Sequence, residues 1–296
     1  MSHFLIIETE RGIALIAAVF LIVVFGFLGV IVVSLVGTQG FSAMNEVKSD
    51  QAFFVAEGGT EFSQRFLAQN LQWYRSTVDP ILIPATNLGA GSFNVSVNLP
   101  ATMLRTRIPD DTSTAPIRVY TTNRFPASGF LQIKEDLLTG DAEFVFYSGI
   151  VGNTFTGISR GQTVGGVSNG ASAHARGDRV YPVTTLTVAL ANSCAAPASF
   201  TVASHPKFLG AGTVDIDGEE ISYTGSTIAG GAMTLTGVTR CQNGTASTAH
   251  NNGRPVTPLL AEGTLPDLEA EIISTGTVSL AAVGNAARSV RKTVQR

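Results

Sequence analysis

Residues that could do chemistry occur in this chain as two pairs at nearly constant spacing. Arg160 and Arg240 are 80 positions apart, and His174 and His250 are 76 positions apart. A guanidinium and an imidazole that recur together could form a paired binding site, because both donate hydrogen bonds to polar ligands. They could instead fix one turn in each copy of a repeated unit, and we favour this second interpretation.

The residues around these pairs repeat as well. The matches are Tyr147 and Gly149 with Tyr223 and Gly225, Gly157 with Gly237, Ala173 with Ala249, Gly177 with Gly253, Val180 with Val256, and Pro182 with Pro258. Recurrence at a fixed period marks a duplicated supersecondary unit. We therefore predict two tandem β modules, over residues 136–182 and 218–258, with a connector over 183–217. Together the modules could hold a surface ligand.

Other sequence patterns that could carry out chemistry are weak. The acidic run Asp215-Ile-Asp-Gly-Glu-Glu220 could supply oxygen ligands to calcium. The first copy of the repeat has no matching run, so we interpret this one as a solvated turn. The sequence contains no His-Glu-x-x-His, Walker A, Gly-x-Ser-x-Gly or Cys-x-x-Cys motif. It therefore predicts a protein that is not an enzyme, with no catalytic residue, no cofactor and no metal site.

Charge and cysteine content point to an exported β-rich protein. Charged residues make up 14% of the chain, against about 25% in average proteins. The net charge of −3 gives no footprint for nucleic acid. The two cysteines, Cys194 and Cys241, could form a disulfide in an exported domain. Two separate thiols remain the alternative at this level.

The element that must position all of this is an apolar stretch near the N terminus. Residues 13–36 carry no charge over 24 positions. As a helix they would extend about 36 Å, which exceeds the roughly 30 Å of a bilayer's hydrocarbon core. We predict a transmembrane helix; the alternative is a buried helix of a soluble enzyme. Gly26 and Gly29 lie within the run, and Gly37 and Gly40 follow it. These glycines could permit close helix packing or local stretching, or they could reflect only that glycine is common in membrane helices.

The helix is expected to continue to about Tyr74 as an amphipathic second half, over residues 37–75. An apolar stripe at helical spacing predicts the face that seats a β-sheet. Its members are Met44, Val47, Phe54, Val55, Phe62 and Phe66.

The junction before the apolar stretch resembles the class III leader of type IV prepilins and pseudopilins. Glu10-Arg11-Gly12 directly precedes Ile13. The resemblance implies that prepilin peptidase cleaves the leader, residues 1–12, after Gly12 and methylates the new N terminus at Ile13. The fifth residue after the cut is Ala17, where major pilins carry glutamate.

Residues 50–62 strengthen this resemblance. They are similar to the "A-F-x-A-A-E-A-G-x-E" region of PilX-type minor pilins and K-type pseudopilins, families that also lack the glutamate. The matching residues are Ala52, Phe53, Ala56, Glu57, Gly59 and, more loosely, Glu61. The resemblance implies that Ala17, Gly26, Gly29, Ala56, Glu57 and Gly59 belong to an assembly helix. It also implies an inner-membrane origin and, as partners, other pilin subunits, the peptidase and an assembly platform.

The remainder of the chain reads as strands and turns, so the expected fold class is α+β. Phe93, Val95 and Val97 alternate with polar residues, as in a half-buried strand. Residues 262–296 read as a hairpin similar to the closing strands of pilin heads. We expect a pilin-like head built from residues 76–135 and 262–296, with the tandem modules inserted into it.

Two functions follow as hypotheses. One is a minor pilin or pseudopilin, a structural subunit at a filament tip that acts in filament initiation or adhesion, in a pilus or a periplasmic pseudopilus. The other is a permanently membrane-anchored, adhesin-like protein that binds a surface ligand through its β modules.

Overall fold

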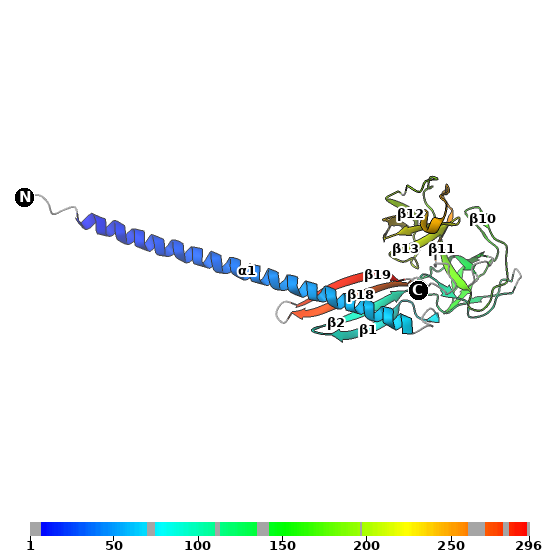
Figure 1. The fold of residues 1–296 in the computed structure, drawn as a ribbon, viewed down its shortest axis with the longest axis horizontal. Coiled ribbons are helices and arrows are strands. Elements are labelled where there is room, and N and C mark those ends of the chain that lie inside the picture. The colour runs from blue at the N-terminus through cyan, green and yellow to red at the C-terminus, as the bar shows by residue number, and fades with distance from the viewer. Residues whose placement is uncertain are drawn as a thin grey trace, which may run out of the picture.

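One long helix projects from a β-rich body (Figure 1). The computed structural model describes residues 7–69, 75–109, 113–134, 142–195, 197–259, 270–280 and 284–294. The expected class, α+β, is confirmed at this level: one helix, α1, precedes a region of several sheets. The first six residues of the expected leader, and residues 70–74 at the expected end of the helix, lie outside the described residues.

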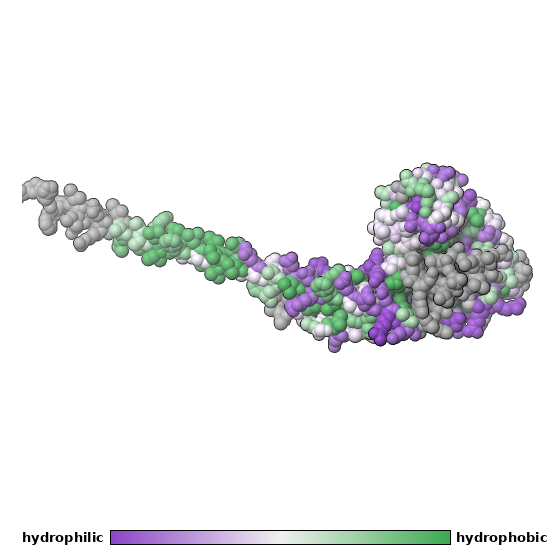
Figure 2. All heavy atoms as spheres, in the orientation of Figure 1, coloured by the Kyte–Doolittle hydropathy of each residue, from purple (hydrophilic) through white to green (hydrophobic). Residues whose placement is uncertain are grey.

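The first half of α1 makes no contact with the body. α1 runs from Ile7 to Gln69 without a break, so Gly12 and Ile13 both lie within it. Its most apolar 18-residue window has a mean hydropathy of 3.2 and is 0% buried. Figure 2 shows a largely apolar surface over the coloured part of this half. By length and composition it can cross a bilayer, as is typical of a membrane anchor or a signal sequence.

The second half of α1 lies on a four-stranded antiparallel sheet. The sheet has the order β1-β2-β18-β19. Its strands are β1 (Ile81–Leu88), β2 (Gly91–Asn98), β18 (Ala270–Leu280) and β19 (Gly284–Val294). β18 and β19 form the expected C-terminal hairpin, and the predicted alternation of β2 is present, with Phe93, Val95 and Val97 facing the core. Strands from the two ends of the body thus combine into one sheet beneath the helix.

The face of α1 that contacts this sheet consists of small residues, so the predicted apolar stripe is wrong. Ala52, Ala56 and Ser63 are fully buried, and Gly59 lies between them on the same face. Of the predicted stripe, Val55 is buried, while Met44, Val47, Phe54, Phe62 and Phe66 are 36–65% exposed.

The physical reason is a close approach of the helix to β18. A side chain at Gly276 of β18 would overlap the carbonyl of Ala52 and the amide of Ala56. A side chain at Gly59 would overlap the ring of Phe93. The side chains of Phe54 and Phe66 are exposed instead, whereas Phe62 is partly exposed and its ring centroid lies 5.6 Å from that of Phe93.

A second, larger sheet forms the far side of the body. It has seven strands: the path β14-β13-β17-β11-β5-β6, and β3 paired with β11. The strands are β3 (Thr102–Met103), β5 (Gly129–Lys134), β6 (Glu143–Tyr147), β11 (Arg179–Thr185), β13 (Gly212–Ile216), β14 (Glu219–Tyr223) and β17 (Pro255–Pro258).

Three small sheets complete the described strands. One has the order β4-β8-β7, with β4 (Ile117–Arg118), β7 (Gly149–Ile150) and β8 (Thr154–Thr156). A second has the order β12-β16-β15, with β12 (Ser199–Ala203), β15 (Gly225–Ala229) and β16 (Ala232–Thr236). The third is the hairpin of β9 (Thr163–Val164) and β10 (Val167–Ser168). A 3-10 turn, η2, spans Gln242–Gly244.

Two hydrophobic clusters divide the body differently from the expected boundaries. The first contains Leu104, Val119 and Leu131 together with Tyr147 and Val180. Residues 102–134, expected in the head, therefore pack with the segment expected as the first module. The second cluster joins Leu186, Phe200 and Val214 to Tyr223 and Val256. Residues 183–217 are thus part of a core rather than a connector. Periodic matches could not show this, because these flanking segments share few identical residues.

Charged groups hold the four-stranded sheet against the rest of the body. The Asp79 carboxylate, at the entry to β1, accepts hydrogen bonds from the fully buried Lys207 ammonium and from Arg124, with an Arg124 Nε to Oδ2 distance of 3.1 Å. Burial, together with the charge of Arg124, lowers the pKa of Lys207 to about 8, although Asp79 opposes the shift. Elsewhere, Glu271 of β18 accepts from the amide of Gly210 at 2.8 Å.

The close helix–sheet contact yields a first prediction. Gly276→Ala places a methyl group against the helix backbone and is expected to reduce the free energy of unfolding by about 1–3 kcal/mol. Denaturant unfolding of the full chain in detergent measures the change. Gly40→Ala is the control, because a side chain there meets nothing within 4 Å. Equal stability of Gly276→Ala and the wild type would contradict the described contact.

Candidate functional site

The first recurring pair of residues meets on a buried carboxylate. Arg160 forms a two-pronged pair with Glu143, with Nε to Oε1 at 2.9 Å and Nη2 to Oε2 at 2.5 Å. His174 Nε2 lies 3.1 Å from the same Oε2. The Arg160 guanidinium also donates to the carbonyls of Pro109 and Ser172. The side chains of this first network are 0–1% exposed.

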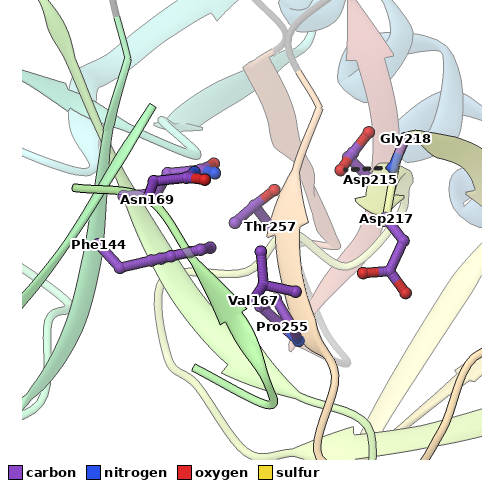
Figure 3. Close-up of a pocket in the computed structure, with 9 residues that line it drawn as sticks. Phe144, Val167, Asn169, Asp215, Asp217, Gly218, Pro255 and Thr257 are labelled. Atoms are coloured by element: carbon purple, nitrogen blue, oxygen red, sulfur yellow. Dashed lines mark hydrogen bonds between the residues drawn. The ribbon is translucent and has the colours of Figure 1, made fainter. Parts of the chain in front are cut away.

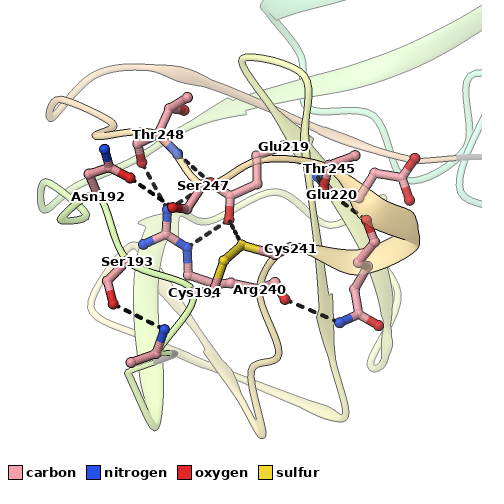
Figure 4. The surroundings of a disulfide bond; sticks show 12 residues. Asn192, Ser193, Cys194, Glu219, Glu220, Arg240, Cys241, Thr245, Ser247 and Thr248 are labelled. Carbon is pink, nitrogen blue, oxygen red and sulfur yellow. Dashed lines mark hydrogen bonds and ion pairs between the residues drawn. A yellow bond between two sulfur atoms is a disulfide. The ribbon is translucent and has the colours of Figure 1, made fainter.

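The second pair builds the same arrangement around Glu219 (Figure 4). Arg240 donates to both oxygens of Glu219, at 2.8 Å and 2.7 Å. His250 Nε2 lies 2.8 Å from Oε2. Arg240 also donates to the carbonyls of Ala191 and Thr248. In both networks the arginine therefore ties one strand-initial glutamate to two loop carbonyls.

Hydrogen bonds keep both glutamates ionised despite their burial. Burial alone would raise the pKa of Glu143, but the bonds from His174, Arg160 and two backbone amides outweigh it and lower the pKa to about 2. The pKa of Glu219 is likewise raised by burial and lowered, on balance, to about 2 by Arg240, His250 and the amide of Thr248. A buried ion pair with all its partners in place orders the loops around it.

These contacts favour the turn-fixing interpretation of the repeated Arg and His residues. Both arginines and both histidines bond to internal partners and are shielded from solvent, although Nδ1 of His174 has no hydrogen-bond partner among the described residues. Sequence reasoning missed the two glutamates that they hold. A signal was present, because Glu143 and Glu219 are separated by 76 residues, the same offset as the histidines. The expectation of a solvated turn over the acidic run is wrong for Glu219, which is 1% exposed, and holds for Asp217 and Gly218, which are exposed.

The predicted disulfide is present beside the second network (Figure 4). Cys194 and Cys241 are bonded across a sequence separation of 47 residues. Cys241 directly follows Arg240 in a left-handed conformation with φ of 57°, and Gly161 occupies the equivalent place after Arg160 with φ of 60°. In the chain-entropy model, a loop of this length contributes about 4 kcal/mol of stability. The bond therefore reinforces the loop that Arg240 also holds.

A pocket of about 220 Å³ lies between the two clusters (Figure 3). From the first half of the body come Gln132, Phe144, Val167 and Asn169; from the second come Asp215, Asp217, Gly218, Pro255 and Thr257. We call this the junction pocket. No group of three or more His, Cys, Asp or Glu residues suited to a metal occurs in the described part of the chain.

The residues expected in an assembly helix are split between the two halves of α1. Ala17, Gly26 and Gly29 lie on the free half, where a side chain at either glycine would meet nothing within 4 Å. Ala56 and Gly59 face the sheet, and Glu57 is exposed. In the structure, Ala56 and Gly59 therefore allow α1 to pack closely on the four-stranded sheet.

Comparison of the chain with protein-family models, with curated proteins and with solved structures finds no match.

The paired networks predict a pH dependence of stability. The pKa values of Glu143 and Glu219 in the folded protein lie below the ordinary 4.5, so their stabilisation is complete above pH 4.5 and is lost as the pH falls toward 2. Each carboxylate is expected to contribute up to about 3 kcal/mol. Glu219→Gln should lower stability at pH 7 and reduce the loss between pH 5 and 2, as measured by denaturant unfolding.

A matched control separates buried from exposed pairs. Glu61 pairs with Lys292 at 3.4 Å, but their side chains are 70% and 46% exposed. Glu61→Gln should therefore change stability by less than about 1 kcal/mol and leave the pH profile as in the wild type. If Glu219→Gln behaved like Glu61→Gln, the second network would not be the source of the acid sensitivity.

Proposed function

We propose that the protein is a minor pilin or pseudopilin, a structural subunit of a type IV pilus or a related filament. On this proposal it enters the inner membrane with its N terminus in the cytoplasm, and prepilin peptidase cleaves it after Gly12. An assembly platform then moves it into a filament with other pilin subunits. The resemblance of residues 1–36 and 50–62 to these families supports the proposal, and so does a helix that is half free and half seated on a sheet.

Apolar surface beyond the membrane-length part of α1 is the observation that carries this proposal. About 20 helical residues cross a hydrocarbon core, and residues 13–36 already supply that length. Seven large apolar side chains further along α1 are still 36–65% exposed: Phe41, Met44, Val47, Phe53, Phe54, Phe62 and Phe66. Large apolar side chains that remain exposed in this number are typical of a surface that associates with another protein. Packing against the helices of neighbouring subunits would bury it.

A position at the filament tip follows from Ala17. In the resembling family, glutamate at this place neutralises the buried terminal amine of the subunit ahead. An unpaired charge in an apolar bundle is costly, so a shaft subunit needs the carboxylate and a subunit with nothing ahead does not. The large body beyond the four-stranded sheet also fits an end of a filament better than a packed shaft. We further propose that its two networks mark a duplicated β unit inserted into a pilin-like head.

The alternative is a permanently anchored, adhesin-like binding protein. The junction pocket favours it, since a pocket between the two clusters could hold a surface ligand. Both proposals use α1 as a membrane helix, and they differ in the fate of residues 1–12.

Processing supplies a direct test. In cells with active prepilin peptidase, the membrane form is expected to begin at a methylated Ile13. Intact-mass analysis of the purified protein measures this, and Gly12→Leu is expected to retain the leader. A wild-type protein that still carries residues 1–12 would support the permanent anchor instead.

Location in filaments supplies the second test. Gold-labelled antibody against residues 142–259, viewed on sheared filaments by electron microscopy, should mark filament ends. Regular label along the shaft would disprove the tip position, and filaments without label would disprove the filament role. A strain that lacks the protein is the control for antibody specificity.

A further inference from the structure

The junction pocket is built on one face of the seven-stranded sheet. Thr257 of β17 lies directly opposite Asp215 of β13, and Gln132 of β5 lies opposite Phe144 of β6. Two strand pairs, one on each side of β11, thus present side chains from both halves of the body to a single space. Figure 3 shows Asn169 on one side of this space and Asp215 on the other, with Thr257 between them.

One wall of the pocket is apolar and is held in place. Phe144 packs in a small cluster with Val164 and Val183, and Val167 of the β9–β10 hairpin covers this cluster. The hairpin tip is fixed because the Arg254 guanidinium donates to the carbonyl of Gly165, with Nη1 to O at 3.4 Å. The wall therefore exists before any ligand arrives, which lowers the entropic cost of binding.

The opposite side carries polar groups with spare hydrogen-bonding capacity. Within the described part of the chain, the side chains of Gln132, Asn169 and Thr257 have no hydrogen-bond partner. Asp215 accepts a single long bond from the amide of Gly218, at 3.4 Å. Burial raises the pKa of this carboxyl group. Together these residues offer one carboxylate acceptor, two amides and one hydroxyl to a ligand.

The charges limit which ligand can use these groups. Asp217 is already engaged by His250 at 2.9 Å and by Arg254 at 3.2 Å. Asp215 stands opposite Glu220 across β13 and β14, and these carboxylates disfavour an anion in the pocket, although the positive charge of Lys134 also acts on Asp215. A metal ion would need more carboxylates than the site supplies. A wholly apolar ligand would displace water from four polar groups without replacing the hydrogen bonds to that water, which is unfavourable.

We propose that the junction pocket binds one pyranose unit of a glycan. A sugar ring has an apolar C–H face to lie on Val167, behind which Phe144 is buried in the small cluster. Its hydroxyl groups donate to Asp215 and exchange bonds with Asn169, Gln132 and Thr257. The volume of about 220 Å³ suits one six-membered ring and is below the range of roughly 300–1,000 Å³ that holds drug-sized ligands. This activity does not depend on filament assembly.

Binding of simple sugars to the full chain tests the proposal. The protein is held in a polyoxyethylene detergent, because sugar-based detergents would compete. Saturation-transfer NMR is recorded with the methyl pyranosides of glucose, galactose, mannose and N-acetylglucosamine. At least one is expected to bind, and Asp215→Asn is expected to weaken it by at least about tenfold. Val167→Trp, which fills the pocket from the hairpin, is expected to abolish binding.

Controls make the outcome decisive. Asp50→Asn removes an exposed carboxylate on α1 and should leave binding unchanged. The thermal unfolding midpoint shows whether each variant is folded. If Asp215→Asn does not fold, Val167→Trp provides the test. The proposal is overturned if none of the four pyranosides binds, or if binding persists in the folded pocket variants. Asp215-dependent binding of calcium or methylammonium without any sugar would identify a cation site and would equally overturn it.

Discussion

A helix can lie directly on a sheet only where neither surface carries a large side chain, and this constraint governs how the protein is assembled. Gly276 in β18 and the small residues Ala52, Ala56 and Gly59 in α1 allow the two backbones to approach closely. Because β18 pairs with β2 on one side and β19 on the other, the helix contact organises the whole four-stranded sheet. The same contact leaves Phe54 exposed, whereas Phe62 is partly exposed and packs against the ring of Phe93. The exposed apolar surface that we propose for association with other subunits is therefore a consequence of how α1 packs on the four-stranded sheet.

Hydrophobic runs and alternation were sufficient to predict the long helix, strand β2 and the C-terminal hairpin. They were not sufficient for the face of the helix, because size complementarity and not hydrophobicity decides which residues touch β18. A pattern that weights phenylalanine above alanine selects the wrong side. The module boundaries were displaced for a related reason. Leu104 and Leu186 enter equivalent cores, but such apolar positions tolerate substitution, and the direct matches between the copies lie outside these flanking segments.

At the candidate sites, the sequence identified Arg160, His174, Arg240, His250 and the cysteine pair, but not what holds them. The role of Glu143 was not recognised because it stands alone at the start of a strand, and that of Glu219 because it lies within an acidic run. The junction pocket could not be foreseen at all. Its residues are spread from Gln132 to Thr257, and they meet only because β11 and β17 join the two halves of the body in one sheet.

The path of the chain has a mechanical consequence. The backbone leaves the four-stranded sheet after β2 and returns to it at β18, and these two strands are neighbours. The chain therefore connects the other sheets to the four-stranded sheet at two adjacent points, the end of β2 and the start of β18. A pull on them, as from a captured surface, is divided between both points. The pulling force then acts along β2 and β18, two paired strands that lie against the helix. Along these strands many hydrogen bonds are loaded at the same time rather than one after another.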